Sequence, residues 1–491
     1  MGTETYIGVD LGTSGAKLLL VDKSGAILSA QTERYPISYP QSGWSEQNPE
    51  DWAKGIMHGI SVLLAGFDHS SVKGIGFGGQ MHGLVVLDKD DRVIRPCILW
   101  NDGRTEKQTE YLNSVIGKER LSSLTANIAF AGFTAPKLLW LRENEPENFA
   151  KIAKIMLPKD YLVYLLTGVH ATDYSDASGM LLLDVKNRRW SDEMCEICSV
   201  KKEWLPKLFE SYERIGTLKK SVAETLGLSE DVVVAAGAGD NAAAAIGTGA
   251  VKNGDCNISL GTSGTIFISG DTFSVDDRNA LHSFCHANGK YHLMGCILSA
   301  ASCNAWWMDV LQATDFDREQ EGAEKYMGRN DLFFLPYLMG ERSPHNDVKA
   351  KGAFIGLHPY TERRQMTLAV MEGVAFALRD CMEVARTGGI GVSKAKLCGG
   401  GARSPLWRKV FANVFGVPMQ IPTTEEGPSY GGAILAMVAC GAYPSVESAT
   451  DKITGVSETV YPDPAVSAAY EERYQIFRRL YPALKDVSQL F

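Results

Sequence analysis

Asp10 lies where a buried strand is expected to end, directly before a glycine-rich turn. It closes the extended apolar segment 6–10 and is followed by the turn 11–15, Leu-Gly-Thr-Ser-Gly. The amides and hydroxyls of such a turn can bind a phosphate. A carboxylate beside a phosphate repels it unless a divalent cation lies between them. Asp10 is therefore a candidate Mg²⁺ ligand; the alternative is an aspartate that caps the turn.

Asp240 occupies a comparable position. It follows the apolar segment 232–236 and precedes a run of alanines that predicts a helix from near Ala242. A carboxylate at this junction is a candidate general base for a substrate hydroxyl. The alternative is a helix N-cap, and the two roles are compatible.

Two further glycine-rich loops follow predicted strands. Gln-Met-His-Gly at 80–83 comes after the strand 72–77, in the position where α/β proteins form ligand pockets. His82 is a candidate ligand there, and a purely structural histidine is the alternative. The run 399–402, Gly-Gly-Gly-Ala, connects a strand to a helix, so its backbone can lie against a ring or a phosphate. A close-packed turn is the alternative.

The Leu-Gly-Thr-Ser-Gly turn occurs twice. Residues 260–264 repeat residues 11–15, and both copies lie between strand-like segments. Rossmann and Walker loops require a helix after the turn, so both are excluded and a β-hairpin is predicted. The repeat indicates two related domains, 1–248 and 249–491, whose hairpins could hold one polyphosphate; chance recurrence is the alternative.

Composition limits the function classes. The 491 residues suffice for two or more domains, and alternating strands and helices indicate an α/β fold. A formal net charge of −9 argues against nucleic acid or an anionic membrane as the main partner. The apolar stretch 232–251 is interrupted by Asp240 and does not predict a membrane span. Ten scattered cysteines and an N-terminus unlike a signal peptide indicate the cytoplasm.

Together these motifs resemble the FGGY family of carbohydrate kinases, within the superfamily of actin, hexokinase and the Hsp70 ATPase. Residues 8–17 and 259–264 are similar to its two phosphate motifs, and 398–404 to its adenosine motif. Residues 132–144 and 352–372 resemble the two family signatures. The resemblance implies an α/β fold of two actin-like, ribonuclease H-like ATPase domains with a cleft between them. The first domain would mainly bind the sugar, and the second, with a C-terminal helix, mainly the nucleotide.

The resemblance also implies ATP and Mg²⁺ as cofactors and assigns roles to individual residues. Asp240 is the expected catalytic base, and Asp10 and Asp240 are the expected metal ligands. The expected substrate-binding residues are Met81, His82, Asp240 and Asn241. The expected nucleotide-binding residues are Gly12, Thr13, Ser14, Lys17, Gly261, Thr262, Ser263, Gly400, Gly401, Ala402 and Ser404.

Four segments, 80–83, 98–104, 157–162 and 340–344, are most similar to the family members that phosphorylate D-xylulose. The expected reaction transfers the γ-phosphoryl group of ATP to the 5-hydroxyl of this sugar. The alternatives are a kinase for another ketose, a polyol or gluconate, a non-catalytic or chaperone-like ATPase, and a sugar-sensing transcription factor. The expected partners are the sugar and ATP, with no nucleic acid and no membrane, in a homodimer.

Overall fold

The computed structural model describes residues 4–491 and divides the chain into two compact units. Unit 1 comprises the residues up to Val251 together with Ser283–Tyr291 and Glu426–Thr454. Unit 2 comprises Lys252–His282, His292–Glu425 and Gly455–Phe491. Two segments from the second half of the chain thus fold with the first half, which a single boundary after residue 248 does not describe.

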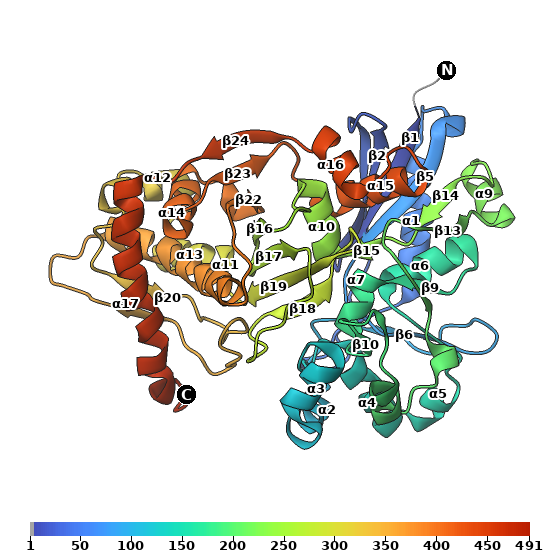
Figure 1. Ribbon diagram of the computed structural model, residues 1–491, viewed down its shortest axis with the longest axis horizontal. Coiled ribbons are helices and arrows are strands. Elements are labelled where there is room, and N and C mark those ends of the chain that lie inside the picture. Colours follow the sequence, from blue (N-terminus) through green and yellow to red (C-terminus); the bar gives the residue numbers. More distant parts are fainter. Residues whose placement is uncertain (1–3) are drawn as a thin grey trace. The chain divides into compact units, whose positions relative to one another are not determined.

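The main sheet of unit 1 has the strand order β13-β14-β5-β1-β2-β3, and the short strand β15 also pairs with β5 (Figure 1). The strands are β1 (Thr5–Leu11), β2 (Gly15–Asp22), β3 (Ile27–Arg34), β5 (Val72–Gly79), β13 (Arg214–Thr217), β14 (Val233–Ala235) and β15 (Ala238–Gly239). Both β1 and β15 run parallel to β5. Their C-terminal ends therefore meet at one edge of the sheet, where open α/β sheets bind ligands.

Successive side chains of β1 and β5 face two different helix layers, as the period of two in a strand requires. Ile7 and Val9 of β1 and Phe77 of β5 belong to a core cluster that includes α1 (Pro49–Leu63) and α6 (Pro158–Thr167). In α1 the buried side chains recur at helical spacing: Trp52, Ile56, Ile60 and Leu63.

The opposite face of the sheet contacts α15 (Gly427–Ala439) through glycines. A Cβ on Gly8 would lie 1.9 Å from the carbonyl oxygen of Ser429, and one on Gly76 would lie 2.1 Å from that of Gly432. Only glycine lets helix and strand backbones approach this closely. α10 (Asp240–Thr248) packs against α15 on the same side. Gly8 and Gly76 are therefore explained by packing, because a side chain at either position would collide with α15.

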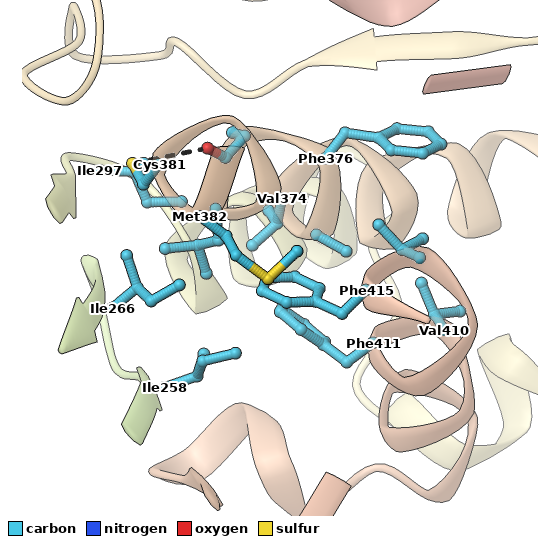
Figure 2. Close-up of a cluster of buried hydrophobic side chains, with 14 of the residues drawn as sticks. Ile258, Ile266, Ile297, Val374, Phe376, Cys381, Met382, Val410, Phe411 and Phe415 are labelled. Atoms are coloured by element: carbon cyan, nitrogen blue, oxygen red, sulfur yellow. Dashed lines mark hydrogen bonds between the residues drawn. The ribbon is translucent and has the colours of Figure 1, made fainter. Parts of the chain in front are cut away.

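Unit 2 contains a second sheet with the order β19-β17-β16-β22-β23-β24. Its strands and main helices are β16 (Asp255–Leu260), β17 (Gly264–Gly270), β19 (Tyr291–Ile297), β22 (Lys394–Cys398), β23 (Met419–Pro422), β24 (Val456–Val460), α11 (Ala301–Val310), α13 (Arg363–Thr387), α14 (Pro405–Phe415) and α17 (Pro464–Ser488). Figure 2 shows Met382 of α13 beside Phe411 and Phe415 of α14, with Ile258 and Ile266 of the strands nearby. These buried side chains hold the two helices against the sheet.

The two predicted hairpins are confirmed. The first repeat joins the antiparallel strands β1 and β2, and the second joins β16 and β17. In each unit the first hairpin strand also pairs in parallel with another strand, β5 in unit 1 and β22 in unit 2. The repeated sequence therefore corresponds to a repeated strand arrangement.

Candidate active site

Asp10 and Asp240 come together at the edge of the sheet in unit 1. In register, Asp10 of β1 lies opposite Gly78 of β5, and Gly78 lies opposite Ala238 of β15. Asp240 follows β15 directly and is the first residue of α10, whose N-cap is Gly239. The alternative that Asp240 caps the helix is therefore wrong. Both aspartates are partly exposed. Strand β5, which has glycines at positions 78 and 79, lies between β1 and β15.

The surroundings make both carboxylates weaker acids than usual. Burial raises the pKa of Asp10 to about 7, and repulsion from Asp240 adds to this effect while Lys17 opposes it. Burial also raises the pKa of Asp240 to about 6, against two hydrogen bonds that favour its charged form. Asn241 donates both, from its backbone N at 2.7 Å and its Nδ2 at 2.8 Å, to Asp240 Oδ1. The expected pair Asp240 and Asn241 is thus one hydrogen-bonded group.

Thr13 ties the first hairpin to two neighbouring segments. Its hydroxyl donates to Gln80 Oε1 at 3.3 Å and accepts from Trp100 Nε1 at 2.9 Å, while Gln47 Nε2 donates to its carbonyl oxygen at 2.7 Å. The turn itself is closed by a bond from Gly12 N to the carbonyl oxygen of Gly15. Asp10 therefore need not cap it. The bond from Trp100 to Thr13 links segment 98–104 to the turn, which its place in the sequence did not reveal.

Of the other residues in the first phosphate motif, Ser14 faces solvent and Lys17 is held in an ion pair. Ser14, at the tip of the turn, is exposed. Lys17 lies opposite Asp10 across the β1–β2 pair, and its Nζ forms an ion pair with Glu426, the residue before α15. The assignment of Gly12, Thr13, Ser14 and Lys17 to the nucleotide stays a prediction.

Met81 and His82 lie in the loop after β5, beside the residue that precedes Asp240. Met81 is buried, and a Cβ on Gly239 would lie 2.8 Å from its Sδ. His82 has a positive φ of 71°, stacks on Phe133 at 4.5 Å between ring centroids, and places Nδ1 2.9 Å from the carbonyl oxygen of Gly179. A carbonyl only accepts, so Nδ1 carries the proton and Nε2 of the neutral ring is an acceptor.

Lys137 is a residue of this site that the analysis of single motifs missed. It lies in α4 (Thr134–Asn144), is completely buried, and donates from Nζ to the carbonyl oxygens of His82 at 2.8 Å and Gly132 at 2.6 Å. Burial lowers its pKa to about 7. The signal was present in the family signature 132–144, but a buried lysine bound to carbonyl groups cannot be recognised from spacing. Its contact helps to hold the unusual backbone of His82.

In unit 2, part of the adenosine motif lines a pocket of about 440 Å³. Gly400, Gly401 and Ser404 line it together with Asn304, Gln320 and Trp407. Ser404 Oγ accepts from Trp407 N as the N-cap of α14 and donates to Gln320 Oε1 at 2.5 Å. Asn304 Oδ1 is buried and accepts no hydrogen bond from the described residues. This pocket offers an unsatisfied acceptor and a glycine backbone.

The remaining predicted nucleotide residues do not line this pocket. Ala402 is buried beside it, and its carbonyl oxygen accepts from Arg408 Nε at 2.5 Å. The second hairpin turn holds Gly261 and Thr262, which are exposed, and Ser263, which is half-buried. The carbonyl oxygen of Thr262 accepts from Ala300 N and from Ser302 Oγ, which ties the turn to the start of α11.

Two kinds of feature are absent from residues 4–491. No helix in this range is both long enough and apolar enough to cross a membrane. No group of three or more His, Cys, Asp or Glu side chains in the same range is arranged to hold a metal. A Mg²⁺ ion that keeps several water and phosphate ligands needs only one or two carboxylates from the protein.

Two family models cover most of the chain. The N-terminal domain of the FGGY family of carbohydrate kinases matches residues 5–247, and the C-terminal domain of the same family matches residues 256–440. The chain belongs to the FGGY family of carbohydrate kinases. The expected family and the two-domain α/β fold of the actin-like ATPase superfamily are therefore confirmed.

Individual FGGY kinases are similar to this chain over almost its whole length. A xylulose kinase from Escherichia coli (strain K12) is 42% identical, covering 98% of this chain and 99% of that protein. A xylulose kinase from Lactococcus lactis subsp. lactis (strain IL1403) is 38% identical, with 99% and 98% covered. The crystal structure of a gluconate kinase from Lactobacillus acidophilus matches with a TM-score of 0.94 at 26% identity, covering 98% of each chain.

Proposed function

We propose that this FGGY kinase transfers the γ-phosphoryl group of ATP to the 5-hydroxyl of D-xylulose, giving D-xylulose 5-phosphate and ADP. The observation that carries the chemistry is the Asp240–Asn241 pair beside Met81 at the sheet edge. The substrate is supported by the xylulose kinases that are 42% and 38% identical over nearly the full length of both chains.

In this proposal Asp240 accepts the proton of the sugar hydroxyl. Both hydrogen bonds from Asn241 go to Oδ1, so Oδ2 is the oxygen that takes the proton. With a pKa of about 6, Asp240 is ionised at neutral pH and yet more basic than an ordinary aspartate. The bonds to Oδ1 fix the carboxylate and leave one oxygen directed for reaction.

We assign Mg²⁺ to Asp10, with Asp240 as the second carboxylate. The donor chemistry fits, because two carboxylates at neighbouring strand ends repel each other and raise the pKa of Asp10. When bound, Mg²⁺ supplies positive charge that neutralises the phosphate oxygens during transfer.

We assign the adenine ring to the pocket lined by Gly400, Gly401 and Ser404. The buried acceptor Asn304 Oδ1 suits the amino group of adenine, which is a donor, and the glycine backbone lets a flat ring approach. The cytoplasm as location is supported by ten cysteines, none of which forms a disulfide. The homodimer stays a prediction.

The base assignment is tested by Asp240→Asn, which keeps the size of the side chain but removes the proton acceptor. We expect kcat to fall by about 10²–10⁴-fold. The Kd of the sugar, measured by calorimetry, should change only modestly. Turnover near that of the unmodified enzyme would exclude Asp240 as the base.

The substrate is tested by kcat/KM for D-xylulose, D-ribulose, L-xylulose, D-gluconate and glycerol. D-Xylulose should be best, and D-ribulose, which differs at C3, should be roughly 10- to 100-fold poorer. Gluconate is the main competitor because a gluconate kinase has a similar structure. Gluconate carries a carboxylate, which a binding site would pair with a cation. Lys137 lies near the sugar loop, but it is buried and its ammonium group already donates to two backbone carbonyl groups. A tenfold preference for gluconate or glycerol would retain the family and overturn the xylulose assignment.

A further inference from the structure

A group of four buried ionisable side chains lies in unit 1, outside the chemistry proposed above. Lys159, in the first turn of α6, has a completely buried side chain. Its Nζ lies 2.6 Å from Asp160 Oδ1, 2.9 Å from Asp173 Oδ1 and 3.6 Å from Asp176 Oδ2. Burying one ammonium beside three carboxyl groups is costly unless each group is held by partners. So expensive an arrangement calls for a structural or functional explanation.

From this group a chain of hydrogen bonds reaches the residue before the proposed base. Asp173 Oδ2 accepts from Ser175 Oγ at 2.5 Å, and the backbone N of Gly239 donates to Ser175 Oγ at 3.2 Å. A serine hydroxyl has a single proton. Because that proton goes to Asp173, Ser175 Oγ is oriented to accept from Gly239. The donor and the acceptor of each hydrogen bond between Asp173, Ser175 and Gly239 are thereby fixed.

Gly239 depends on outside contacts for its position. It has no side chain, and Met81 excludes one, since a Cβ there would lie 2.8 Å from Met81 Sδ. It also precedes the first turn of α10, whose N–H groups have no partner within the helix. β15 pairs with β5 through Gly239, and the bond to Ser175 adds a contact from its backbone N to a side chain, directly beside Asp240.

The same group also contacts the strand between the two site carboxylates. A Cβ on Gly79 of β5 would lie 2.9 Å from the Cβ of Lys159. Gly79 in turn pairs with Gly239. Lys159 thus packs directly against β5, and it is linked to Gly239 of β15 through its ion pair with Asp173 and the hydrogen bonds of Ser175.

We propose that Ser175 is a positioning residue for Asp240. Asp173 and Lys159 orient its hydroxyl, and the hydroxyl holds the peptide from which the carboxylate of Asp240 projects. This inference rests on the proposed role of Asp240 as the base. Misplacing a reacting group by about 1 Å can cost roughly 100-fold in rate, so loss of this bond should appear mainly in kcat.

The chain offers a matched control in Ser211. Both serines are buried and both donate to Asp173 Oδ2, Ser211 at 2.7 Å. The carbonyl oxygen of Ser211 accepts from Gly237 N, but that backbone bond survives a change of side chain. Ser211→Ala therefore removes a similar buried hydrogen bond without touching Gly239.

The experiment compares Ser175→Ala with Ser211→Ala in the full-length enzyme, measuring kcat, the sugar Kd by calorimetry and Tm. We expect Ser175→Ala to lower kcat by roughly 10- to 100-fold with a sugar Kd within about twofold. Ser211→Ala should keep kcat within about twofold while losing a similar amount of Tm. Ser175→Cys, which retains only a weak acceptor, should give an intermediate kcat, and it serves as the probe if Ser175→Ala fails to fold.

Equal kcat values in the two alanine variants, or a loss confined to sugar Kd, would overturn the positioning role. Asp240→Asn, measured in parallel, separates the two proposals. If it abolishes turnover while the two serine variants behave alike, only the positioning role is lost. If it retains turnover, the base assignment fails and the positioning role falls with it.

Discussion

At the scale of single residues, the two site carboxylates differ in how the protein treats them. Asp240 receives two hydrogen bonds from Asn241, which partly offset the effect of burial on its pKa. The pKa of Asp10 is raised further, because burial and repulsion from Asp240 outweigh Lys17. Lys17 itself is paired with Glu426, which also raises the pKa of Asp10. In the absence of a cation, Asp10 therefore ionises much less readily than an ordinary aspartate.

Asp10→Asn should therefore stabilise the protein without ligands. A carboxyl whose pKa is higher in the folded state than in the unfolded state costs stability as pH rises, here from about 4 to about 7. Replacing it should raise Tm at pH 8 by about 2–6 °C and raise the Mg²⁺ concentration needed for half-maximal rate. The gain in Tm should shrink at pH 5, and a gain that is equal at both pH values would contradict this account.

At the scale of elements, the two repeated turns differ in what their threonines contact. The hydroxyl of Thr13 forms hydrogen bonds with Gln80 and Trp100 beside the sugar loop, whereas Thr262 is exposed and is bonded to other described residues through its backbone oxygen. We expect Thr262→Val to raise the KM for ATP alone. Thr13→Val should raise the KM values for both ATP and sugar, each by roughly 3- to 10-fold, because it breaks two hydrogen bonds. Steady-state kinetics with each substrate varied checks this. An equal change in sugar KM in both variants would count against the assignment.

The contact between α10 and α15 is a second property of elements. A Cβ on Gly431 of α15 would lie 1.9 Å from the carbonyl oxygen of Ala243 in α10. Gly431→Ala must therefore push α10, which begins at Asp240, away from α15. We expect a loss of about 1–3 kcal/mol in the free energy of unfolding, together with a lower kcat. Gly55→Ala in α1 is the control, because its new Cβ meets nothing closer than 3.6 Å and alanine favours a helix. Denaturant titration of both variants decides the point, and equal stabilities would refute it.

At the scale of the whole molecule, unit 1 is discontinuous along the chain. Helix α15 packs against the glycines of β1 and β5, although in the sequence the segments of unit 2 lie between these strands and the helix. A fragment of residues 1–248 would expose that face and lack the buried side chains of α15, which include Ile434, Leu435 and Met437. We expect it to show no cooperative thermal transition by circular dichroism. Co-expression with 249–491 should restore one; a fragment that melts cooperatively alone would show that α15 is dispensable.

Local patterns in the sequence determined much of this protein. The strand before the run 399–402 and the helix after it were predicted, and the structure has them as β22 and α14, because turn residues, caps and apolar spacing act within a few residues. The repeated turn likewise predicted two hairpins, since a strand rather than a helix follows it. The positions of Asp10 and Asp240 at strand ends follow from the same local rules, which is why both were recognised as site candidates.

Tertiary structure alone decided which partners these residues have. The bond from Lys137 to the carbonyl of His82, the ion pair of Lys17 with Glu426 and the path from Lys159 through Ser175 to Gly239 join segments far apart in the chain. The return of α15 to the first sheet is of the same kind. Such contacts depend on which backbones pack closely and on which buried polar groups must satisfy one another, and neither condition is encoded within one stretch of sequence.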